Sequence, residues 1–197
     1  MTLAINKRKT PRQIRAQATV EAILEASAHI LVDFGHGALT TNKIAERAGV
    51  SIGSLYQYFP NKEAVMTELI RHKRSRMLAA VDMALDDTRS DVFDTALDAV
   101  LASIIQLQLN WPRLALALDQ AEVFLPLNDE TILFKVALNG KINEVLGRQG
   151  SKVSEQTIQD VVAIAKGMIE HASLARETDE VDLRRRIMRA VIGYLGR

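Results

Sequence analysis

Hydrogen-bonding side chains gather in residues 51–58, which read Ser-Ile-Gly-Ser-Leu-Tyr-Gln-Tyr. Turned as a helix at about 100° per residue, this segment places Gly53, Ser54 and Gln57 on one face. Tyr56 and Tyr58 lie at the edges of that face. A glutamine amide can pair with an adenine edge, and serine and tyrosine hydroxyls can reach phosphates. Since Gly53 has no side chain, the face suits a partner that approaches closely and is recognised by hydrogen bonds.

The flanking residues predict the element that positions this face. We expect residues 42–48 to form a short helix with Thr41 as its N-cap and Gly49 at its end. A second short helix is expected over about 52–59. Two short helices that meet at a glycine are typical of a helix-turn-helix. We therefore predict this motif over residues 41–60, with Ile52, Leu55 and Phe59 turned toward the protein.

Charge is distributed unevenly along the chain. Residues 1–76 carry 12 Lys and Arg against 6 Asp and Glu, whereas residues 77–197 carry 13 against 18. A basic first third suits a polyanion, and nucleic acid is the commonest one. Residues 1–12 are expected to be a flexible basic arm. Together with Lys43, Arg47 and Lys62, this arm would supply the positive charge that residues 51–59 lack.

Composition narrows the class of protein. The chain has 197 residues, of which 48% are hydrophobic, with 10 Gly, 4 Pro and no Cys. Low Gly and Pro contents favour helices over a sandwich or barrel, and the absence of Cys excludes disulfides and thiolate metal sites. No apolar run approaches the ~20 residues of a membrane span, and the basic N-terminus lacks the apolar stretch of a secretory signal. We expect a cytoplasmic protein without a membrane partner.

Apolar residues at helical spacing continue to the end of the chain, so we predict an all-α fold. The first domain, over residues 1–62, would be a three-helix domain that contains the helix-turn-helix, and the second, over 63–197, would be a helical domain. Outside residues 41–60, the expected helices cover about 11–34, a longer stretch after Asn61, 91–110, 113–122, the stretch from the turn at 125–129 to about 147, 154–175 and 180–195. In the last of these helices, i,i+4 pairs are expected between Glu180 and Arg184 and between Asp182 and Arg186.

The N-terminal part of the chain resembles the DNA-binding domain of TetR-type (tetracycline-repressor) transcriptional regulators. The resemblance covers about residues 15–65 and rests on four runs: Ile23-Leu24-Glu25-Ala26, Leu39-Thr40-Thr41, Ile44-Ala45-Glu46-Arg47-Ala48-Gly49-Val50-Ser51 and Gly53-Ser54-Leu55-Tyr56-Gln57-Tyr58-Phe59-Pro60-Asn61-Lys62-Glu63-Ala64. It implies that Thr41, Tyr56 and Lys62 contact the DNA backbone. It also implies that further residues lie at or near the groove, namely Asn42, Ser51, Gly53, Ser54, Gln57 and Tyr58.

For the C-terminal part, the resemblance implies an effector-binding domain that dimerises through its last two helices. The expected dimerisation residues lie on one apolar face of each helix: Ile158, Val161, Val162, Ala165, Ile169, Ile187, Val191 and Tyr194. A second apolar face on residues 154–175, with Ile164, Met168, His171 and Leu174, leaves open which face meets the chain's own core and which meets a partner. Candidates for the pocket wall are Leu107, Trp111, Phe124, Phe134, Met168 and His171, although for each of them an ordinary core position is favoured, because apolar residues at helical spacing are usually core.

No catalytic or metal site is indicated. The chain lacks a G-x-S-x-G motif and a P-loop, and its four histidines show no metal-ligand spacing. We therefore expect neither enzymatic activity nor a cofactor. The leading hypothesis is a dimeric, ligand-released repressor that binds a near-palindromic operator. Two alternatives remain: a helical protein that binds a small molecule or partner and whose DNA contact is vestigial, and a non-specific nucleoid-type binder.

Overall fold

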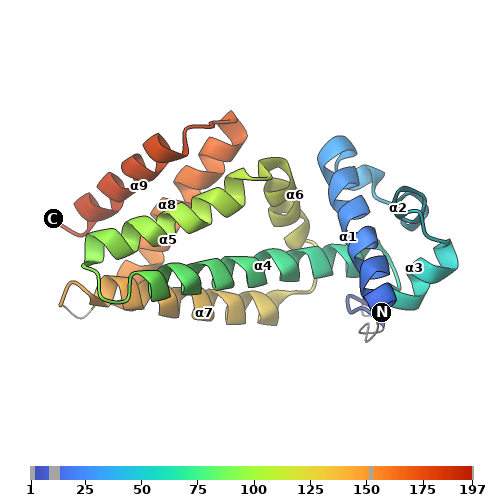
Figure 1. Ribbon diagram of the computed structural model, residues 1–197, viewed down its shortest axis with the longest axis horizontal. Coiled ribbons are helices and arrows are strands. Elements are labelled where there is room, and N and C mark those ends of the chain that lie inside the picture. Colours follow the sequence, from blue (N-terminus) through green and yellow to red (C-terminus); the bar gives the residue numbers. More distant parts are fainter. Residues whose placement is uncertain (1–2, 9–13, 151–152, 197) are drawn as a thin grey trace. The chain divides into compact units, whose positions relative to one another are not determined.

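The computed structural model describes residues 3–8, 14–150 and 153–196 (Figure 1). Within these residues it contains nine α-helices and one short 3-10 helix, which confirms the expected all-α fold. The helices are α1 (Ile14–Phe34), η1 (His36–Ala38), α2 (Thr41–Ala48), α3 (Ile52–Tyr58), α4 (Lys62–Asp87), α5 (Phe93–Leu109), α6 (Pro112–Glu122), α7 (Asn128–Gly147), α8 (Glu155–Ala175) and α9 (Glu180–Tyr194). Residues 11–13 of the first expected helix lie outside the described part.

Most helix ends follow from capping residues in the sequence. The side chains of Ser51, Ser154 and Asp179 accept hydrogen bonds from backbone N–H groups at the starts of α3, α8 and α9. Asn61 does the same for α4, at 2.8 Å from the nitrogen of Ala64. Such caps satisfy donors that the first turn of a helix leaves unpaired, so the helix starts are well defined.

The chain divides into two compact units, and each is described by itself. Unit 1 comprises Met1–Lys73 and Arg113–Asn128, so it contains α1, α2, α3, the first half of α4 and all of α6. Its apolar core joins residues of α1 such as Ile23 and Leu31 to Leu55 of α3 and Ile70 of α4. Leu118 of α6 belongs to the same core. The interior against which α3 is held is therefore built partly from a segment far away in the sequence.

Unit 2 comprises Arg74–Pro112 and Asp129–Arg197, and holds α5, α7, α8, α9 and the second half of α4. Helices α5, α8 and α9 pack against one another, and α7 runs beside the second half of α4 (Figure 1). Arg148, just after α7, donates to the carbonyl of Leu85 at 3.4 Å, and Lys141 pairs with Asp82. The compact units thus differ in extent from the predicted domains over residues 1–62 and 63–197, because residues 63–73 and 113–128 also belong to unit 1.

One of the two expected pairs in α9 is present and the other is replaced. Arg186 Nε lies 2.7 Å from Asp182, as expected for an i,i+4 pair. Arg184 instead pairs with Asp98 of α5 at 3.1 Å, so the predicted Glu180–Arg184 pair is wrong. The arginine reaches across to a neighbouring helix because α5 and α9 are packed together, a contact that spacing within one helix cannot reveal.

Among the described residues, no helix combines the length and apolarity needed to cross a bilayer. No group of three or more His, Asp or Glu side chains among them is arranged to hold a metal ion.

Candidate nucleic-acid interface

The turn between α2 and α3 has the backbone geometry of a helix-turn-helix. Gly49 has φ 66° and ψ 28°, in the left-handed region where a side chain costs energy, and its N–H bonds back to the end of α2. The N–H of Val50 donates to the carbonyl of Ala45 at 3.0 Å, and Ser51 then caps α3. The expected glycine end of the first helix and the serine start of the second are both confirmed.

The N-cap of α2 is Thr40, so the assignment of this role to Thr41 is wrong. Thr40 has extended backbone angles and its side chain accepts a hydrogen bond from the nitrogen of Lys43. Thr41 is the first residue of α2, and its hydroxyl lies 3.1 Å from the hydroxyl of Tyr56 on α3. Adjacent threonines are both good caps, and the choice depends on backbone angles that the sequence does not specify. The Thr41 hydroxyl is therefore directed to Tyr56 rather than to the start of its own helix.

Helix α3 is held by one fully buried face. Leu55 and Phe59 are 0% exposed, which confirms that they are turned toward the protein. Ile52 is 39% exposed, so its predicted inward position is wrong. The half-buried Val50, just before the cap, packs against the core of unit 1. Ile52, at the first position of α3, therefore adds its side chain to the outer surface.

The opposite face of α3 presents small and hydrogen-bonding groups. Gly53 and Gln57 are exposed, Ser54 is half-buried, and the Ser54 hydroxyl lies 2.8 Å from that of Ser51. A Cβ built at Gly53 would meet only Ser51 Oγ, at an ordinary 3.8 Å. Because glycine inside a helix costs about 1 kcal/mol relative to alanine and no neighbour in the chain demands it, the empty position favours an outside partner.

The remaining predicted interface residues surround this face. Tyr56 is 39% exposed with its hydroxyl paired to Thr41, whereas Tyr58 is half-buried against the core of unit 1. Asn42 is exposed at the start of α2, and Lys62 is half-buried at the start of α4. Arg47 forms an ion pair with Asp33 at 3.1 Å, so its charge is already partly matched within the unit.

The described part of the basic arm contacts the rest of unit 1. Ile5 packs against its apolar core. Lys7 forms an ion pair with Glu68 of α4, and Arg8 donates to the carbonyl of Tyr56 at 3.1 Å. The predicted arm thus has specific contacts at residues 5–8, while residues 1–2 and 9–12 lie outside the described part. The short apolar run Leu3-Ala4-Ile5 is a signal in the sequence that points to this docking.

The residues expected to line an effector pocket are not gathered in one unit. Leu107, Phe134 and Met168 are half-buried in unit 2. Trp111 is 37% exposed and His171 is exposed. Phe124 lies in unit 1 and is 80% exposed. The Phe134 ring faces the buried Arg74 guanidinium at 5.4 Å, a favourable cation–π distance.

The predicted dimerisation residues divide into buried and accessible groups. Val162 and Ala165 are half-buried, and Tyr194 is 46% exposed. The other five, at 0–8% exposed, are already buried inside unit 2: Ile158, Val161, Ile169, Ile187 and Val191. On the outer side of the same two helices, Leu174 and Val181 are each 67% exposed.

Tyr194 also takes part in a hydrogen bond between α8 and α9. Its hydroxyl donates to Asp160 Oδ2 at 2.5 Å. This bond stabilises the ionised carboxylate, so it lowers the pKa of Asp160, and it raises the pKa of the Tyr194 hydroxyl. This hydrogen bond links the C-terminal end of α9 to the N-terminal part of α8.

Comparisons with known proteins agree with the geometry of unit 1. Residues 23–69 match the family model of bacterial regulatory proteins of the tetR family. YdeS of Bacillus subtilis (strain 168), named as an uncharacterized HTH-type transcriptional regulator, is 38% identical over 90 residues. That match covers 45% of this chain and 41% of YdeS, so the matched stretch spans about two fifths of the relative's length.

Solved structures extend the likeness to the whole fold. A TetR-family transcriptional regulator from Streptomyces coelicolor has a TM-score of 0.67 at 24% identity, with 92% of this chain and 98% of that chain covered. FadR from Bacillus subtilis, a transcriptional regulator solved in complex with stearoyl-CoA, has a TM-score of 0.70 at 20% identity, with 87% and 96% covered. The chain thus carries a TetR-family N-terminal domain and shares the all-helical fold of TetR-family transcriptional regulators.

Proposed function

We propose that this chain is a sequence-specific DNA-binding transcriptional regulator that uses α3 as its recognition helix. The observation that carries the proposal is the division of α3 into two faces. Leu55 and Phe59 are fully buried, whereas Gly53 and Gln57 are exposed. A helix that packs against the protein through one face and has small or hydrogen-bonding side chains on the other can enter a major groove.

Some of the side chains on and around α3 would contact DNA bases, and others would contact the DNA backbone. Gln57 is placed to read an adenine edge, and Ser54 to contact a base or a phosphate. The hydroxyls of Thr41 and Tyr56 are hydrogen-bonded at 3.1 Å, so the one that accepts keeps its own proton to donate to a phosphate oxygen, and Lys62 adds a positive charge. Asn42, Ser51 and Tyr58 complete the interface as flanking contacts.

We further propose that the functional form is a homodimer. Two copies of α3 on a two-fold axis would read a near-palindromic operator with half-sites about one helical turn apart or somewhat more. Since much of the predicted apolar face of α8 and α9 is filled by unit 2 itself, the contact between copies would use their outer side chains. Leu174, Val181 and Tyr194 are the exposed ones.

The proposed regulation is release from DNA on binding of a small molecule in the helical C-terminal part. Half-buried residues on three different helices of unit 2, Leu107, Phe134 and Met168, support a site among α5, α7 and α8. FadR, which shares the fold, was solved with stearoyl-CoA bound. A ligand acts as a switch only if it binds the DNA-competent and DNA-released geometries with different affinity.

The test is selection from random duplex DNA with the purified full-length protein at moderate salt, without added ligand. Enrichment of a two-fold symmetric sequence, bound with strong salt dependence, is the expected result. Salt-dependent binding without enrichment would indicate a non-specific nucleoid-type binder instead. If the protein binds no DNA, the selection is repeated after unfolding and refolding to remove any retained ligand. If it still binds no DNA, the proposal is refuted and the chain is a helical protein that binds a ligand or a partner.

A further inference from the structure

The last turn of α3 leaves backbone carbonyls that the helix itself cannot satisfy. The chain leaves the helical path at Phe59, which has φ −123° and ψ 121°. The next residue is Pro60, which has no N–H to donate. The carbonyls at the C-terminal end of a helix need external donors, and here the following residues cannot supply one to Tyr56.

Arg8 supplies donors to this turn. Its guanidinium Nη1 donates to the carbonyl of Tyr56 at 3.1 Å, and its backbone N–H donates to the carbonyl of Tyr58 at 2.6 Å. A positive side chain at a helix C-terminus also interacts favourably with the helix dipole. Arg8 thus donates hydrogen bonds to two of the backbone carbonyls at the end of α3.

The residues just before Arg8 are anchored to the first half of α4 and to the core of unit 1. Ile5 packs against the core, and the side-chain oxygen of Asn6 accepts a hydrogen bond from Arg71 at 2.8 Å. Lys7 forms an ion pair with Glu68, whose side chain is only 7% exposed. Residues 5–8, hereafter the N-terminal strap, therefore connect the end of α3 to α4: Arg8 makes two hydrogen bonds to α3, and Asn6 and Lys7 each make one contact to α4.

We propose that Arg8 is a positioning residue for the recognition helix. It would act through the backbone of Tyr56 and Tyr58, which holds the intervening Gln57 at a fixed height and angle on the outer face of α3. This inference rests on the proposed DNA-binding function of α3. It adds that operator affinity depends on the N-terminal strap even where the strap does not touch DNA.

The first measurement needs no DNA. Amide hydrogen exchange of the full-length Arg8→Ala protein is compared with that of the unmodified chain, at Leu55 and Phe59 of α3 and at amides of α5 and α9. We expect exchange in α3 to accelerate by about tenfold, the equivalent of about 1.4 kcal/mol and the range of a hydrogen bond to a charged group. Exchange in α5 and α9 should stay unchanged. Unchanged exchange in α3 would overturn the proposal.

The second measurement separates positioning from direct contact with DNA. A lost phosphate contact reduces the slope of log affinity against log salt concentration by about 0.9, whereas lost positioning weakens affinity with little change in slope. We expect Arg8→Ala to weaken operator binding about tenfold at nearly constant slope, and Arg8→Lys, which keeps a charged donor, to recover part of the loss. A reduced slope with unchanged α3 exchange would make Arg8 a phosphate contact and overturn the proposal.

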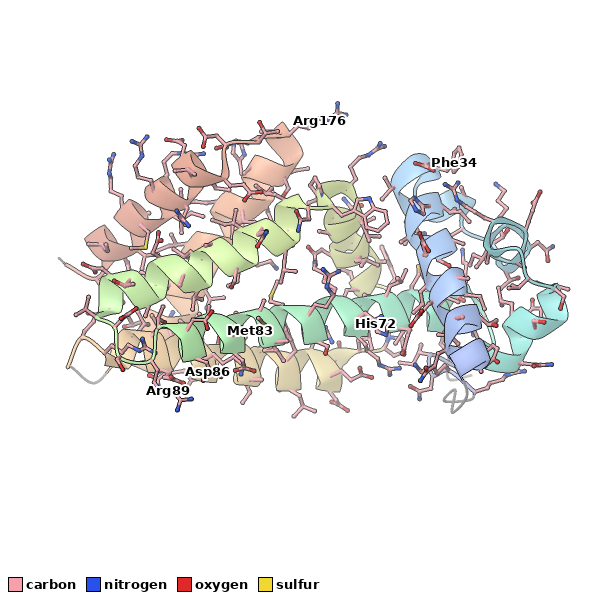
Figure 2. The ribbon with its side chains drawn as sticks, viewed as in Figure 1. Phe34, His72, Met83, Asp86, Arg89 and Arg176 are labelled. Carbon is pink, nitrogen blue, oxygen red and sulfur yellow. The ribbon has the colours of Figure 1, made fainter. Side chains whose placement is uncertain are left out.

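Two variants serve as controls. Arg89→Ala removes an exposed arginine in unit 2 whose side chain pairs with Asp86 at 2.7 Å (Figure 2), and it should change neither readout. If Arg8→Ala does not fold, Asn6→Ala loosens the strap more mildly and should accelerate exchange in α3 to a smaller extent. If the unmodified chain selects no operator while Arg8→Ala still loosens α3, the positioning of α3 by Arg8 is upheld and the DNA-binding function is what fails.

Discussion

Replacing Thr67 by valine should stabilise unit 1. Thr67 lies on α4, is 0% exposed, and its hydroxyl oxygen has no hydrogen-bond partner within the part of the chain that the structure describes. A buried hydroxyl without a partner costs about 1–3 kcal/mol. Valine has nearly the same shape and helix propensity, so little strain opposes the gain. We expect the free energy of unfolding of unit 1 to rise by about 1–2 kcal/mol, and its melting temperature by about 4–8 °C per kcal/mol, the range for a unit of fewer than 100 residues.

Thr88 provides a matched control for the same substitution. It is also buried, at 7% exposed, but its hydroxyl donates to the carbonyl of Ala84 at 2.7 Å. Thr88→Val removes a hydrogen bond that is made, so we expect a loss of about 0.5–1.5 kcal/mol. The two variants should therefore shift stability in opposite directions.

Urea unfolding followed by two probes measures both effects. The single tryptophan, Trp111, lies in unit 2 and its fluorescence reports on the Thr88 variant, while amide exchange in α1 reports on the Thr67 variant. If Thr67→Val destabilises unit 1 as much as Thr88→Val destabilises unit 2, then the Thr67 hydroxyl is hydrogen-bonded in solution and the reasoning is refuted.

Three further predictions concern the interface, the dimer and pH. Gln57→Ala should abolish discrimination at one base pair of the selected operator, a loss of about 1–3 kcal/mol. Lys62→Ala should instead weaken binding to all duplexes alike and lower the slope of log affinity against log salt concentration by about 0.9. Competition binding at several salt concentrations checks both, and an unchanged sequence preference in Gln57→Ala would contradict the orientation of α3. Leu174→Lys should shift the sedimentation of the protein toward monomer, whereas Met83→Lys, at the same 67% exposure on α4 (Figure 2), should not; equal behaviour of the two would place the dimer contact elsewhere. Hydrogen bonds from Arg185 and Arg186 lower the pKa of Asp182, so its stabilising contribution is complete above the ordinary aspartate pKa and is lost as pH falls below about 4; Arg185→Gln should raise the Asp182 pKa measured by NMR, and an unchanged value would exclude the bond in solution.

The sequence was sufficient for features that depend on local spacing and capping. Leu55 and Phe59 are four residues apart on a helix, so their shared burial follows from the helical period. Gly49 and Ser51 mark the turn because only certain residues suit a left-handed backbone or an N-cap. The boundaries of α5 to α9 lie within a few residues of those expected from apolar periodicity and from Trp111-Pro112.

Features that depend on long-range packing could not be predicted from the sequence. The period of an apolar stripe does not say which surface covers it, so Ile158 and Ile187 fit a subunit contact as well as the interior of unit 2, where they lie. Arg184 reaches Asp98 only because α5 and α9 are neighbours. The docking of residues 3–8 likewise depends on the tertiary positions of Glu68 and Tyr56.

The placement of α6 bears on how this chain can be divided. Unit 1 is discontinuous in sequence, since the chain leaves it after Lys73, returns at Arg113 and leaves again after Asn128. A fragment that ends at residue 73 would lack Leu118 and Leu125, and would expose to water the apolar side chains of α1 and α4 that share a core with them. Unit 1 therefore cannot be cut out, or exchanged with that of a relative, at a single junction: a folded chimaera has to carry residues 113–128 along with the N-terminal helices.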